Sequence, residues 1–180
     1  MKILSIFKIS ILLLTFGCSS DNDSNNNNNT QNMSEDILGL WELTAYSSNS
    51  TTAETGRVVV ESLSSSDYSI EFTNNPNQIN VSGTLAVEVA ETYNGNTSIF
   101  NYNINGNYDE GFHTGEWRIE NGYLITRSFE NDPNEEGSFD LITEIVELTS
   151  HSLILKIDNS QYSSENSTRT GIRTLTYEKQ

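Results

Sequence analysis

The chain has 180 residues, of which 25 are acidic and nine are basic, so its formal net charge at pH 7 is −16. A charge of this sign and size repels phosphate backbones and anionic lipid headgroups, which argues against nucleic acid binding. The only cysteine is Cys18, so the chain can form neither an internal disulfide nor a metal site built on several cysteines.

The first 17 residues have the layout of a secretory signal peptide. Two lysines are followed by an apolar run from Ile9 to Phe16, and Gly17 stands directly before Cys18. An apolar run of this length cannot cross a bilayer core, which needs roughly 20 residues. We therefore expect a cleaved signal rather than a permanent transmembrane helix.

The segment Thr15 to Cys18 resembles the lipobox of bacterial lipoproteins. In that family the chain is cleaved before the cysteine, whose thiol receives a diacylglycerol and whose new amino group is acylated. The resemblance implies that residues 1–17 are a lipoprotein signal peptide and that Cys18 is the lipidation site. Each buried CH₂ contributes about 0.8 kcal/mol, so two or three acyl chains would hold the protein on a membrane almost permanently.

Residues 18–36 are expected to form the lipidated cysteine and a disordered tether. The tether is made of Ser, Asn and Asp with almost no apolar residue, and it cannot bury enough surface to offset the entropy of ordering. Its acidic start, Ser19 to Asp23, resembles the export signals of lipoproteins from the Bacteroidetes group. That resemblance implies a lipid anchor in the outer membrane, on either its periplasmic face or the cell surface.

Residues 37–180 are predicted to form one all-β domain. Short segments rich in Val, Ile, Thr, Tyr and Phe alternate with Asn, Gly and Ser, and hairpin turns are expected at Asn121-Gly122 and Ser150-His151. Short links between consecutive strands favour an antiparallel up-and-down β-barrel of eight to nine strands, with a β-sandwich as the alternative. The predicted strands lie near residues 38–46, 67–73, 78–91, 97–105, 113–120, 122–130, 139–149, 152–158 and 171–179.

Two features interrupt this regular pattern. Gly83 falls on the apolar face of a strand, where a missing side chain lets a bent strand pass close to a neighbour. The connection from Ser47 to Ser66 is about twenty residues long, and connections of that length in compact domains tend to be lids or binding loops. Within it, Arg57 to Val60 is expected to form a short extra strand or helical turn.

The segment Gly39-Leu40-Trp41 resembles the Gly-x-Trp signature of lipocalins. The wider pattern is similar to lipocalin-like lipoproteins of Bacteroidetes, with matching segments at Trp117 to Leu124 and Glu147 to Leu155. The resemblance implies a lipocalin-like (calycin) barrel in which Trp41 closes the base and a basic residue of the last strand covers the indole. Arg173 is the first candidate for that residue and Lys179 the second.

Few residues suggest catalysis or metal binding. His113 and His151 fall in different predicted turns, and the chain has no nucleophile elbow. His113 is a candidate for ligand contact or pH sensitivity, whereas His151 is expected to be a solvated turn residue. The segment Asp132 to Gly137 imitates the first half of a calcium loop but has Thr143 where a bidentate Glu is required. We expect no enzymatic activity, no cofactor and no metal site.

Aromatic residues on the predicted strands are the candidates for ligand contact. An eight-stranded barrel is just wide enough to be filled by side chains or to hold one small ligand. The first hypothesis is a monomeric binding protein that holds a small apolar or amphipathic molecule beneath the Ser47 to Ser66 loop. The alternative is a filled barrel that engages an envelope protein or a glycan. The candidate ligand-binding residues are Tyr68, Phe72, Phe100, Tyr102, Trp117 and Tyr123.

Overall fold

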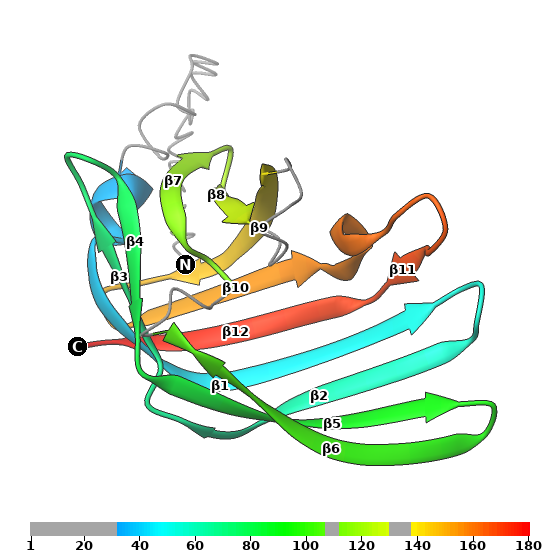
Figure 1. The fold of residues 1–180 in the computed structure, drawn as a ribbon. Coiled ribbons are helices and arrows are strands. Elements are labelled where there is room, and N and C mark those ends of the chain that lie inside the picture. The colour runs from blue at the N-terminus through cyan, green and yellow to red at the C-terminus, as the bar shows by residue number, and fades with distance from the viewer. Residues whose placement is uncertain (1–31, 107–111, 130–137) are drawn as a thin grey trace, which may run out of the picture.

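A computed structural model describes residues 32–106, 112–129 and 138–180 (Figure 1). The described chain is nearly all β, which confirms the predicted fold class. A helical turn over residues 32–36 precedes the first strand. The strands are β1 (Gly39–Thr52), β2 (Arg57–Ser66), β3 (Ser69–Thr73), β4 (Gln78–Ser82), β5 (Thr84–Tyr93), β6 (Asn96–Asn105), β7 (Gly115–Glu120), β8 (Tyr123–Phe129), β9 (Ser138–Leu148), β10 (Ser152–Asp158), β11 (Arg169–Thr170) and β12 (Ile172–Lys179), with a 3₁₀ turn, η2 (Asn159–Tyr162), after β10.

Eight of these strands close into an antiparallel barrel. Around the ring the order is β1, β12, β10, β9, β8, β7, β4 and β3, and pairing of β3 with β1 completes it. Within the ring, the pairing of β4 with β7 is the shortest. It consists of two residue pairs, Gln78 with Glu116 and Ile79 with Gly115. Because the strands form one continuous closed sheet, the sandwich alternative is wrong.

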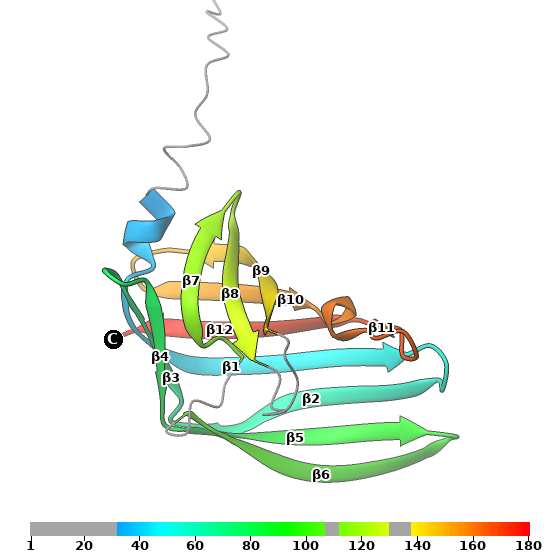
Figure 2. The same ribbon diagram turned by 45° about the horizontal axis from the view of Figure 1, so that its top comes forward.

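Three strands extend the sheet outside the ring. β1 pairs with β3 through its first four residues, Gly39 to Glu42, and with β2 through its last six, Ser47 to Thr52. β5 then pairs with β2, and β6 pairs with β5 over ten consecutive residues. In Figure 2 these strands run well past β7 and β8, so the barrel opens on this side onto a long sheet.

The predicted lid from Ser47 to Ser66 is wrong. β1 continues to Thr52, a turn covers residues 53–56, and β2 returns from Arg57, so this region is a β-hairpin. The prediction failed because Ser, Asn and Thr are typical of loops when read alone. Here pairing with β12 on one side and β5 on the other holds them in the sheet, and tertiary context overrides their local preference.

Gly83 allows a sharp bend in one long strand. It interrupts β4 and β5, which otherwise run in one register against β3 and β2. Its φ is +74°, and a Cβ at this position would lie 2.1 Å from the carbonyl oxygen of Asp67. Only glycine fits such an approach, so the predicted close passage of a neighbouring chain at Gly83 is confirmed.

Both predicted hairpin turns are present. Asn121 and Gly122 link β7 to β8 with φ values of +53° and +82°, the positive values that a type I′ turn requires. Residues 149–151 link β9 to β10, and His151 is exposed there as expected.

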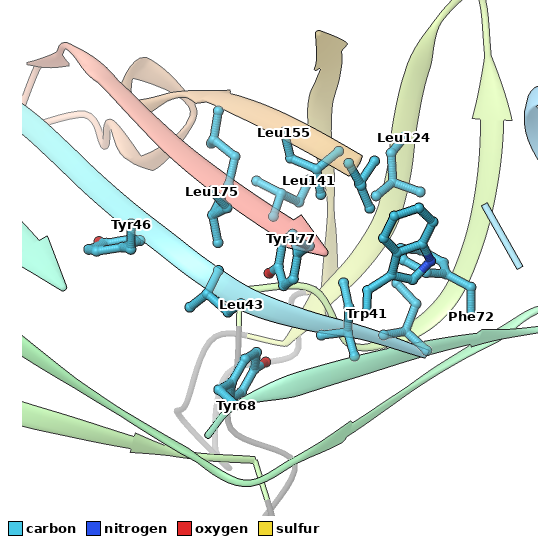
Figure 3. Close-up of a cluster of buried hydrophobic side chains, with 14 of the residues drawn as sticks. Trp41, Leu43, Tyr46, Tyr68, Phe72, Leu124, Leu141, Leu155, Leu175 and Tyr177 are labelled. Atoms are coloured by element: carbon cyan, nitrogen blue, oxygen red, sulfur yellow. The ribbon is translucent and has the colours of Figure 1, made fainter. Parts of the chain in front are cut away.

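Side chains from all eight ring strands fill the inside of the barrel (Figure 3). Ile37 is also fully buried, and the partly buried Met33 in the helical turn packs against the same core. The fully buried large side chains are Trp41, Tyr68, Tyr177, Phe72, Ile37, Leu43, Ile70, Leu85, Leu124, Leu141, Leu153 and Leu155.

Candidate ligand-binding site

The base of the barrel is closed by Trp41. Its indole is fully buried, and the indole N–H donates a hydrogen bond of 2.7 Å to the Ile37 carbonyl. The ammonium of Lys179 lies 4.9 Å from the ring centroid, within the range of a cation–π interaction, and donates to the Asp36 carbonyl at 3.0 Å. Gly39 leaves room for this lysine, because a Cβ there would lie 3.3 Å from its Cε.

The basic residue over Trp41 is therefore Lys179, and the expectation for Arg173 is wrong. The register of β1 with β12 gives the reason. Trp41 is the direct partner of Lys179, whereas Arg173 pairs with Ser48, farther along β1 where it leaves the ring. Arg173 thus lies at the open side of the barrel.

At that open side Arg173 and Glu61 form the centre of a polar and aromatic group that we call the mouth cluster. The guanidinium lies 3.6 Å from the Glu61 carboxylate, and the two side chains are only 16% and 13% exposed. Three aromatic rings surround the guanidinium, with centroids at 4.7, 5.4 and 6.0 Å from its carbon atom. The mouth cluster comprises Tyr46, Glu61, Tyr102, Phe112, Tyr162 and Arg173.

Hydrogen bonds and stacking fix the members of the mouth cluster. The Tyr46 hydroxyl donates to the Glu61 carboxylate at 2.5 Å, the Tyr102 hydroxyl lies 3.4 Å from its other oxygen, and the Tyr46 ring stacks on Phe112. Burial raises the pKa of Tyr46 far above its ordinary value, so its hydroxyl stays a donor. Burial alone would lower the pKa of Arg173, but the neighbouring tyrosines and Glu61 outweigh it and keep the guanidinium charged.

A polar hollow of about 170 Å³ adjoins the mouth cluster. Directly paired residues of a sheet point to the same face, and the register places Ser48 between Glu61 and Arg173, and Thr52 between Arg57 and Arg169. Hydroxyl-bearing residues of β1 thus form the floor, and longer side chains of its neighbours form the walls. The hollow is lined by Ser50, Thr52, Arg57, Val59, Glu61, Asn159, Tyr162, Arg169 and Arg173.

The six aromatic candidates for ligand contact fall in three separate places. Tyr68, Phe72 and Trp117 are at most 4% exposed and belong to the packed core, where Trp117 makes an edge-to-face contact with Phe72. Phe100 and Tyr102 share the face of β6 that continues the mouth, as their register with Val89 and Val87 of β5 shows. The structure therefore brings only these two of the six near the polar hollow.

The sixth candidate, Tyr123, lies on the outer side of the barrel. It is 45% exposed and lines a hollow of about 370 Å³ over β8, β9 and β10. The Lys156–Glu144 ion pair, 3.4 Å long, crosses this hollow, and Gln161 bonds to both backbone groups of Ile142 at its edge. This outer hollow is separated from the mouth cluster by the sheet itself.

His113 is buried inside the barrel, and its Nε2 lies 2.9 Å from the hydroxyl of Thr143, which is also fully buried. Burial, together with the positive charge of Arg173, lowers the pKa of His113 to about 3. The His–Thr pair is therefore neutral at physiological pH and enclosed by the core. Within the described parts of the chain no three His, Cys, Asp or Glu side chains gather as a metal site, and the segment Asp132 to Gly137 lies outside them.

Most residues around the polar hollow were not among the sequence candidates. Glu61 and Arg57 are not candidates when the region from Ser47 to Ser66 is predicted as a loop, because that prediction hides its two-residue period. Tyr162 lies in η2, between two predicted strands. Read as a strand, Ser48, Ser50 and Thr52 alternate with the opposite face. That period was the available signal, although the partner strands could not be named without the register.

No protein-family model, curated protein or solved structure matches this chain. In the described part of the chain, no helix is long and apolar enough to span a membrane.

Proposed function

We propose that this protein is a lipid-anchored, lipocalin-like binding protein of the cell envelope, and that it holds a small amphipathic molecule at the mouth of its barrel. The mouth cluster carries this proposal. A buried Arg–Glu pair enclosed by aromatic rings, beside an open hollow, supplies the few fixed polar groups that orient a ligand among apolar walls. The ligand would lie on the open sheet rather than beneath a lid.

Several observations support a lipocalin-like reading. The barrel has eight antiparallel strands in its ring, its first strand begins with Gly39, and a lysine of the last strand covers the buried Trp41. A non-enzymatic role agrees with the placement of the two histidines. His113 is enclosed in the core, and His151 lies in an exposed turn.

The anchor is proposed from Cys18, which lies outside the described residues. Replacement of Cys18 by Ala removes the only thiol that could be acylated, so we expect this variant to lose incorporation of labelled palmitate and to leave the membrane fraction. Fractionation of cells that produce either form measures both effects. A Ser19→Ala variant is the matched control and should remain anchored. Retention of the Cys18→Ala form on membranes to the same extent would contradict the lipid anchor.

Native mass spectrometry of the protein purified from its own envelope tests the binding function. We expect a retained small molecule that is lost from a Phe100→Glu variant, because Phe100 is 45% exposed on the mouth side of β6 and a carboxylate there disrupts an apolar wall. Ile99→Glu is the matched control, since its side chain is 67% exposed on the opposite face of the same strand. No adduct in the wild type, or equal loss from both variants, would contradict the proposal.

A second candidate function is an interaction module that pairs with an envelope protein through β6. Among the described residues β6 pairs only with β5, and its ten residues contain no charge and no proline, which are the usual protections of a free sheet edge. This candidate predicts a retained polypeptide in the same mass measurement instead of a small molecule.

A further inference from the structure

The polar hollow contains a concentration of positive charge that is unusual for this chain. Nine Lys and Arg residues occur in the sequence, and two of them, Lys2 and Lys8, belong to the predicted signal peptide, so 9 − 2 = 7 remain. Three of these seven, Arg57, Arg169 and Arg173, line one hollow of about 170 Å³. In a protein with a net charge of −16 this grouping requires a local explanation.

Carboxylates balance two of the three arginines. Arg57 forms an ion pair of 2.6 Å with Glu91, and Arg173 lies 3.6 Å from Glu61. Arg169 pairs with no carboxylate of the described residues. The nearby Glu54 uses both of its carboxylate oxygens to accept hydrogen bonds from the Thr168 N–H, at 3.0 and 2.9 Å. The side chains that line the hollow itself carry three positive charges, on Arg57, Arg169 and Arg173, against the one negative charge of Glu61.

Hydrogen bonds and strand pairing fix the backbone of Arg169, whereas its guanidinium has no carboxylate partner among the described residues. Its N–H donates to the Ser163 hydroxyl at 2.8 Å, and β11 pairs Arg169 with Thr52 of β1. Thr52 also pairs with Arg57. The backbones of the two arginines therefore lie on either side of Thr52, and their Cα atoms are two strand spacings, or about 10 Å, apart. This spacing suits one oxyanion that contacts both guanidinium groups and the hydroxyl between them.

Two buried polar atoms at the inner end of the hollow lack partners among the described residues. Asn159 is 2% exposed, and its amide N–H donates to the Asn49 carbonyl at 2.8 Å, which leaves its Oδ1 as an unused acceptor. The Nε of Arg173 is a buried donor that likewise has no partner among the described residues. Both atoms are fully enclosed by protein, so a ligand that occupies the hollow contacts neither of them.

We propose that the polar hollow is a binding site for a small carboxylate, which lies between Arg57 and Arg169. This inference rests on the proposed binding function and specifies the chemistry of the polar part of its ligand. The hydroxyls of Ser50 and Thr52 on the floor complete the polar contacts, and the Tyr162 ring forms one side.

Titration of the full chain with D-gluconate, followed by backbone amide NMR shifts, tests the inference. We expect saturable shifts at Ser50, Thr52 and Asn159, and binding at least about tenfold weaker for sorbitol, which has the hydroxyls without the carboxylate. Arg169→Gln should weaken gluconate binding about tenfold. Arg118→Gln is the matched control, because Arg118 pairs with Glu120 and Asp140 on the outside of the barrel, far from the hollow in the register.

Equal affinity for gluconate and sorbitol would overturn the inference, as would equal effects of the Arg169 and Arg118 substitutions or the absence of saturable shifts at the hollow. Failure of the broader function has a different signature. If gluconate does not bind but the native protein still retains a small molecule that depends on Phe100, the binding function stands and the carboxylate site is wrong. If neither result is obtained, both proposals fail.

Discussion

Trp41→Ala should destabilise the protein by about 3 to 5 kcal/mol, the usual range when a large aromatic side chain is removed from a packed core. The indole is fully buried, and several neighbours depend on it. Its removal leaves the Ile37 carbonyl without its 2.7 Å donor and the Lys179 ammonium without the ring beneath it. Urea unfolding, with the free energy extrapolated to zero denaturant, measures the loss.

Two further variants separate the contributions at this position. Leu40→Ala is the control for a change in the same strand, because Leu40 is 42% exposed on the opposite face, and it should change stability by less than about 0.5 kcal/mol. Lys179→Met keeps the length of the side chain and removes the charge, with an expected cost of about 1 kcal/mol for a cation–π contact. A Trp41→Ala cost no larger than that of Leu40→Ala would show that the barrel does not depend on its base.

The sequence predicts the ring of the barrel well because the ring depends on local signals. The alternation of Ile79, Leu85 and Val87 fixes which face of β4 and β5 is buried, and Asn121-Gly122 fixes a turn through its positive φ values. These signals act within a few residues of the chain. The predicted consecutive order holds from β7 to β10, but it is wrong for β6, which was expected between the preceding strand and β7 and instead pairs with β5 outside the ring, while β7 pairs with β4.

The extension of the sheet and the candidate site depend instead on pairing between distant segments. Ser48 and Thr52 pair on one side with β2, the next strand along the chain, and on the other side with Arg173 and Arg169, which lie more than one hundred residues later. The same register decides which basic residue reaches Trp41. A shift of the last strand could have placed Arg173 there, and nothing in the residues themselves distinguishes the two alignments.

The aromatic candidates illustrate the same limit. Tyr68 and Phe72 are aromatic, as many ligand-contacting residues are, yet both are fully buried in the packed core. Whether an inward side chain meets a ligand or another side chain depends on the width of the ring at that level. That width is a property of the whole closed sheet and not of one strand.

Acid should weaken the fold through His113. Its pKa in the folded protein is about 3, because burial disfavours the charged form and Arg173 repels it, whereas an unfolded chain has a histidine pKa near 6.5. Between these two values the unfolded state binds more protons, so the free energy of unfolding falls as the pH falls. From pH 8 to pH 5 this single group should remove roughly 2 kcal/mol of stability.

The pH dependence of urea unfolding in a His113→Gln variant isolates this contribution. Gln keeps a polar group able to reach the Thr143 hydroxyl but does not titrate, so the stability of the variant should fall less steeply than that of the wild type between pH 8 and pH 5. His151→Gln removes the exposed histidine and should keep the wild-type slope. Equal slopes for all three proteins would mean that His113 opens to solvent before it accepts a proton.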